Sequence, residues 1–131
     1  MEQKFFDRCV MRLQQETKEE KALCERSVRA IEDKWTGYFE DSASDRLKLN
    51  DVEVLLKQTR IQICDDNSRI KTLDQLLEEM GSVWHKMSIL EHTLLGIVFA
   101  GTEPGDAKRF HVLMRNYTKE YIDNKCVSLE Q

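Results

Sequence analysis

The chain has 131 residues, of which 40% are hydrophobic and 34% are charged, and its net charge is −4 at pH 7. This length predicts one domain or one elongated helical unit. No stretch is a block of Lys and Arg, so we expect no nucleic-acid partner. With only one Pro and five Gly, the sequence predicts an all-α fold, because strand-rich domains of this size need many turn residues.

The first predicted helix runs from about residue 3 to about residue 40. Its apolar stripe is well populated at both ends and weak in the middle, where Thr17 and Glu20 stand at stripe positions. Such a helix is marginal alone, so contacts with other helices must stabilise it. Near its end, Trp35, Tyr38 and Phe39 either close the core or anchor a partner chain, as aromatic residues often do at interfaces. The core-closing role is the favoured interpretation.

The second predicted helix spans about residues 45–80 and carries the strongest pattern in the chain. Ten positions follow one another at alternating gaps of three and four, and eight of the ten are apolar. This heptad pattern is typical of a helix that packs against a partner helix. We call these positions the heptad seam: Leu49, Val52, Leu56, Thr59, Ile63, Asp66, Ile70, Leu73, Leu77 and Met80.

Asp66 is the charged member of the heptad seam. A polar residue at a core position can fix the alignment of paired helices and the choice of partner. The run Asp65-Asp66-Asn67 also resembles the start of a calcium loop in composition, but the required glycine and the terminal glutamate are missing. We therefore expect a role in register and no bound calcium.

The polar run at 40–45 separates the two long predicted helices. Their matched lengths and short connection predict an antiparallel coiled-coil hairpin over residues 1–81. A near-continuous rod through the break is the competing geometry, since Ser-Ala-Ser does not forbid helix. Parallel or antiparallel pairing and oligomeric state stay open at this point.

Residues 82–131 predict a shorter helical hairpin, with helices over about 83–100 and 107–125. A turn with Pro104 and Asp106 separates them, and Asp106 is a candidate helix cap. The stretch from Val83 to Phe99 is the most apolar in the chain. We expect it to be the most buried, against the last helix or against another subunit. It is too short for a membrane span. Trp84 is a further possible partner anchor.

Motifs for chemistry are weak throughout the sequence. His85 and His92 are seven residues apart, too far for one metal ion, and with His111 they suit surface or structural roles. The cysteines form no CxxC pair, and no signal peptide is apparent, so we expect a reducing compartment. We predict no catalytic, cofactor-binding or metal-binding residue and no small-molecule substrate.

The sequence therefore favours an elongated, non-enzymatic coiled-coil subunit of a larger assembly, acting through helix–helix contacts with itself or with another helical protein. Cytoskeletal, ciliary, chromosome-associated and trafficking assemblies are the expected settings, in the cytoplasm or nucleus. The alternative is a self-contained, monomeric three- or four-helix bundle that binds a partner peptide or helix in a groove. No run of residues is specific enough to assign the chain to a family.

Overall fold

A computed structural model describes residues 1–39 and 49–130. Its helices are α1 (Gln3–Thr17), α2 (Lys21–Gly37), α3 (Leu49–Gln58), α4 (Leu73–Val83), the 3-10 turn η1 (Trp84–Lys86), α5 (Ile89–Ala100) and α6 (Pro104–Glu130). No strand occurs within the described ranges. They contain one isolated antiparallel β-bridge, between Cys64 and Ile70. The all-α expectation is confirmed. The predicted long coiled-coil hairpin and the elongated shape are not confirmed, because both predicted helices of the hairpin are interrupted.

The first interruption separates α1 from α2. Lys18 has a positive φ of 60° and ends α1 with its amide donating to the carbonyl of Gln14. The Thr17 hydroxyl donates to the carbonyl of Leu13 and accepts from the amide of Glu19. A side chain that bonds to nearby backbone competes with helix continuation. The break falls where the predicted apolar stripe was weakest, so the chain folds back instead of extending.

The second interruption divides the heptad seam into two short helices. After α3, Arg60 and Ser68 adopt positive φ values of 65° and 60°. The carboxylate of Asp65 accepts hydrogen bonds from the amides of Asn67 and Arg69, at 2.9 and 3.0 Å. This closes a tight turn of the kind that Asp and Asn stabilise. The prediction of one helix over 45–80 was wrong between Thr59 and Thr72 for this local reason.

The start of α4 is fixed by a capping box. The Thr72 hydroxyl accepts from the amide of Gln75, and the Gln75 side chain accepts from the amide of Thr72. Ser88 and Glu91 form the same arrangement at the start of α5. The last helix, α6, begins at Pro104, before the predicted cap at Asp106. Proline suits a first helical position because the amide there needs no partner.

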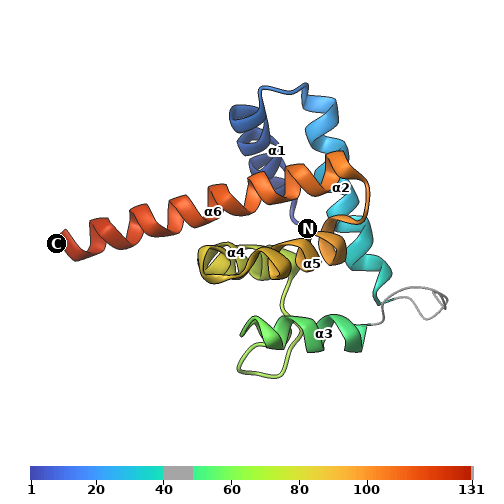
Figure 1. The fold of residues 1–131 in the computed structure, drawn as a ribbon, viewed down its shortest axis with the longest axis vertical. Helices are drawn as coiled ribbons and strands as arrows, with labels where there is room; N and C mark the ends of the chain where they lie inside the picture. Colours follow the sequence, from blue (N-terminus) through green and yellow to red (C-terminus); the bar gives the residue numbers. More distant parts are fainter. Residues whose placement is uncertain (40–48, 131) are drawn as a thin grey trace.

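Helix α6 crosses the centre of the molecule and extends beyond the other helices toward its C-terminal end (Figure 1). It packs against α1, α2, α4, α5 and η1. Phe110, Leu113 and Met114 of α6 are almost fully buried in this core. Helices from both predicted segments, 1–81 and 82–131, therefore share one hydrophobic core.

A buried polar cluster links α6 to the start of α2. Asp106 accepts from the Ser27 hydroxyl at 2.6 Å. Arg109 donates to both carboxylate oxygens of Glu19, at 3.1 and 2.7 Å, and to the Ser27 hydroxyl at 3.0 Å. The two hydrogen bonds to Glu19 hold the pKa of its carboxyl below the ordinary value. This cluster fixes where α6 meets the α1–α2 connection.

Candidate functional site

Helix α5 exposes a group of large aliphatic side chains. Ile89 is 85% exposed, Leu90 68%, Leu94 37% and Ile97 40%. At about 100° per residue, these four and Thr93 fall within an arc of roughly 140°. No charged residue of α5 lies on this arc. We call Ile89, Leu90, Thr93, Leu94 and Ile97 the α5 surface.

The opposite side of α5 faces the protein core. Leu95, Val98 and Phe99 are buried there, where α5 packs against α2 and α6. The Tyr38 hydroxyl donates to the carbonyl of Val98 and holds α2 to α5. The expectation that this stretch is the most buried is thus wrong for the α5 surface. Helices α2 and α6 cover only one of its two apolar sides.

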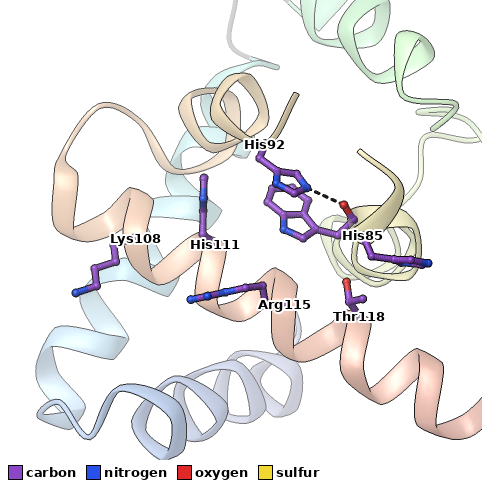
Figure 2. A pocket seen from close by; sticks show the side chains of 7 residues that line it. His85, His92, Lys108, His111, Arg115 and Thr118 are labelled. Carbon is purple, nitrogen blue, oxygen red and sulfur yellow. Dashed lines mark hydrogen bonds between the residues drawn. The ribbon is translucent and has the colours of Figure 1, made fainter. Parts of the chain in front are cut away.

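A cavity of about 470 Å³ opens beside α5, between η1 and α6. Its lining residues are Trp84, His85, His92, Lys108, His111, Arg115 and Thr118. Lys108, His111 and Arg115 follow one another along α6, and His111 points toward His92 of α5 (Figure 2). We call this the basic cavity. It brings together side chains from three elements of the fold.

The geometry of the basic cavity rests on close aromatic packing. The Trp84 and His92 rings stack with centroids 4.0 Å apart and an interplanar angle of 9°. His92 Nε2 donates to the carbonyl oxygen of Trp84 at 2.7 Å (Figure 2). His111 meets Trp84 edge-on at 5.6 Å. Gly96 leaves room for His111, because a Cβ there would lie 2.7 Å from His111 Nε2.

The charges around the basic cavity are of one sign. No Asp or Glu of the described chain belongs to its lining. Within that same part, neither Lys108 nor Arg115 forms a salt bridge. Burial, followed by the charges of His92 and Arg115, lowers the pKa of His111. The cavity therefore places Lys108 and Arg115 where the described side chains do not pair with them.

The heptad seam does not form one surface in the structure. Val52 and Leu56 of α3 and Leu73, Leu77 and Met80 of α4 are buried. The side chain of Leu49 lies outside the described residues.

The rest of the heptad seam lies in the connection between α3 and α4. Thr59 and Ile63 are buried there, whereas Ile70 is 49% exposed. Asp66 is exposed in the turn that Asp65 closes. It therefore does not occupy a helix-core position, and the register role predicted for it does not apply in this fold.

The aromatic anchor candidates separate into buried and exposed residues. Trp35 and Tyr38 are buried in the core, and Trp35 stacks on Phe99 with centroids 5.8 Å apart. Phe39 is 43% exposed and contacts the edge of Trp35. Trp84 is 3% exposed and forms part of the basic cavity wall.

Sequence reasoning missed both the α5 surface and the basic cavity. The α5 surface could have been inferred from the hydrophobic residues on every side of this helix, because such a helix must be covered on two sides to be fully buried. The signal for the basic cavity was Lys108, His111 and Arg115 at spacings of three and four, which share one helix face. Only the packing of α5 and η1 against α6 adds His92 and Trp84 to them.

Other kinds of site find little support in the described part of the chain. Its residues include no group of three or more His, Cys, Asp or Glu placed to hold a metal ion. None of its helices combines the length and apolar character that a membrane span requires. Cys9 and Cys24 are buried and Cys64 is exposed, all with free thiols. Burial raises the pKa of the Cys9 thiol to about 11, which makes it a poor nucleophile.

No protein-family model matches the sequence, and no match is found among curated proteins or among solved structures. The α5 surface and the basic cavity are therefore interpreted from their own geometry.

Proposed function

We propose that the chain is a non-enzymatic adaptor subunit that binds an amphipathic helix of another protein on the α5 surface. The observation that carries the proposal is the exposure of Ile89, Leu90, Leu94 and Ile97 on one side of a well-anchored helix. Burial of a large aliphatic side chain contributes about 1.5–3 kcal/mol. A clustered group of such side chains is the usual mark of a protein-binding site.

The spacing on the α5 surface suits a helix as the bound element. Leu90 and Leu94 form one row at a spacing of four residues, and Ile89, Thr93 and Ile97 form a second row. Helices pack by placing the ridges of one between such rows of the other. Recognition of an amphipathic helix by an apolar surface is a common mode of peptide binding.

The size of the α5 surface favours a partner helix over a second copy of the chain. Four aliphatic side chains offer a few hundred Å², whereas a standard interface buries roughly 800 Å² on each partner. A single docked helix fits the smaller area. The hydrophobic core, which α1, α2, α4, α5 and α6 complete within one chain, also supports the monomeric-bundle alternative over an obligate coiled-coil oligomer.

Site-specific photo-crosslinking tests the proposal. A photoreactive amino acid replaces Thr93, at the centre of the α5 surface, and the protein is expressed in its native source. We expect crosslinks to one helical segment of another protein, identified by mass spectrometry of the joined peptides. The matched control places the same amino acid at Glu78, which is exposed on α4. Equal crosslinking from Glu78, or crosslinks only to copies of this chain, would refute a specific partner helix.

A second variant separates docking from folding. Leu90→Glu/Ile97→Glu places charge on exposed positions of α5 and should leave the thermal unfolding temperature nearly unchanged. The same change should abolish the Thr93 crosslink to the partner. In sedimentation velocity, we expect the purified chain to remain monomeric across concentrations. Dissociation of a dimer on dilution would instead support self-association.

In this proposal the chain catalyses no reaction, and the expected cellular assemblies are those named in the sequence analysis. These are cytoskeletal, ciliary, chromosome-associated or trafficking assemblies in a reducing compartment, the cytoplasm or nucleus. The partner identified by crosslinking would select one of them.

A further inference from the structure

The basic cavity differs from the α5 surface in its shape and in its chemistry. It is concave, with a volume of about 470 Å³, which lies in the range of small-molecule sites. The α5 surface is a row of aliphatic side chains on one helix. The two features therefore call for different occupants, and the cavity is formed without a partner helix.

The cationic side of the cavity is built on one helix. Lys108, His111 and Arg115 lie at successive spacings of three and four residues, so they share a face over two turns of α6. Together they supply an ammonium, an imidazole and a guanidinium group within one cavity. Donors of this kind are the ones that bind phosphate and carboxylate oxygens in proteins.

The acidic residues nearby do not neutralise these cations. Glu19 lies close enough for Lys108 to help lower the pKa of its carboxyl. Its oxygens, however, are occupied by Arg109. Asp106 accepts from Ser27. Within the described residues, Lys108 and Arg115 thus form no salt bridge, and their charges can bind an added anion.

The other side of the cavity is aromatic. Trp84 and His92 are stacked, and His92 is held by its bond to the Trp84 carbonyl. His111 packs against Trp84 and over Gly96. These rings are fixed by packing before any ligand arrives, so little ordering cost remains for binding. An inorganic anion would leave this apolar wall uncovered.

We propose that the basic cavity is a binding site for a small organic anion, one that carries a phosphate or carboxylate group on a flat apolar body. Lys108 and Arg115 bind the anionic oxygens, and the imidazoles of His92 and His111, which pack on the buried Trp84, contact the body. The ligand lies between α6 and η1.

Phenyl phosphate is the probe for a titration followed by NMR of the histidine ring resonances. Inorganic phosphate serves as the probe with charge alone, and phenol as the probe with the ring alone. We expect phenyl phosphate to bind at least tenfold more tightly than either and to shift the ring resonances of His92 and His111. Bound anion should also raise the pKa of His111, because it stabilises the imidazolium. Binding should weaken as salt is added.

Paired charge variants give the decisive comparison. Lys108→Gln/Arg115→Gln removes both cations from exposed side chains and should weaken phenyl phosphate binding at least tenfold. The control Lys4→Gln/Arg69→Gln removes one Lys and one Arg from exposed positions outside the cavity and should leave the affinity unchanged. Melting curves of both variants verify that the fold persists. The salt dependence of phenyl phosphate binding to the unmodified protein is a further test that needs no variant.

Three results would overturn the proposal. One is the absence of histidine shifts up to millimolar phenyl phosphate. Another is an equal loss of binding in the control variant, which would indicate nonspecific attraction. The third is binding of a phosphotyrosine peptide more than tenfold tighter than phenyl phosphate, because the anion would then belong to a partner chain and not to a small molecule. None of these results bears on crosslinking from Thr93.

Discussion

The Sγ atom of Cys9 lies 3.5 Å from the hydroxyl oxygen of Tyr117, which joins α1 to α6 in the protein interior. The Tyr117 ring also stacks on Phe5 at 6.2 Å and lies under the Arg12 guanidinium at 4.5 Å. Burial is the main cause that raises the pKa of both Cys9 and Tyr117. Both groups are therefore protonated in the folded protein well above neutral pH.

The first prediction concerns alkaline stability. Because folding raises the pKa of Cys9 from 9.0 to about 11, the thiol contributes stability that is present below pH 9 and is lost as the pH rises to 11. The difference in unfolding free energy between the natural protein and Cys9→Ala should shrink by roughly 2–3 kcal/mol over this range. Urea denaturation at several pH values measures it. A difference for Cys9→Ala that stays constant over this pH range would contradict the prediction.

The second prediction concerns the closest approach of α4 to α6. A Cβ at Gly81 would lie 2.3 Å from the Tyr117 Cβ and 3.5 Å from its Cα, so the backbones must move apart. We expect Gly81→Ala to destabilise the protein by about 1–3 kcal/mol, as overpacking does. In the comparison variant, Gly105→Ala, the new Cβ lies 3.1 Å from the Arg109 guanidinium, which Glu19 and Ser27 hold, so a side-chain end and no backbone must shift. That change should alter stability by less than about 1 kcal/mol in chemical denaturation.

The third prediction concerns the Arg109–Glu19 pair. Arg109→Gln should destabilise the protein at pH 7, because it removes both hydrogen bonds to Glu19 and the bond to Ser27. Since Arg109 lowers the pKa of Glu19 below its ordinary 4.5, this contribution is present above pH 4.5 and is lost at more acidic pH. The stability gap between the two proteins should therefore narrow on acidification. Urea midpoints at pH 7 and pH 3.5 measure it; a gap that widens would contradict the role of the ion pair.

The fourth prediction contrasts two leucines of α5. Leu95 is fully buried and Leu90 is 68% exposed. Leu95→Ala should lower the free energy of unfolding by about 2–5 kcal/mol, since it leaves a cavity in the core. Leu90→Ala should change it by no more than about 0.5 kcal/mol. Thermal or urea unfolding of both variants is the measurement. A comparable loss for Leu90→Ala would mean that the chain covers the α5 surface itself.

Helix content could be predicted from the sequence, but helix ends often could not. The heptad spacing from Leu49 to Met80 is regular, yet the segment after Gln58 leaves the helix. The reason is local: Asp65 binds the amides of Asn67 and Arg69, and Thr72 caps a new helix. A repeat of apolar positions indicates most of the side chains that are buried, such as Val52 and Leu77, although Ile70 is 49% exposed. It does not indicate whether the backbone between them is continuous.

The candidate sites were harder to predict, for a different reason. The histidines at 85, 92 and 111 looked unrelated, because their spacing fits no single-helix motif. Their association depends on α6 crossing α5, a tertiary contact that helix periodicity does not specify. The α5 surface was not predicted because a helix that is apolar on all sides is usually buried. Here the neighbours that would bury Leu90 and Ile97 within one chain are absent from the described residues.

The central position of α6 has a consequence for biosynthesis. The ribosome makes this helix after α1 to α5, yet each of α1, α2, α4 and α5 buries its apolar side against it. The nascent chain must therefore keep Phe99, which stacks on Phe110 of α6, from aggregating until the residues after Pro104 emerge. The shared core can therefore close only after α6 has emerged, and any cellular factor that shields the growing chain would act before that moment.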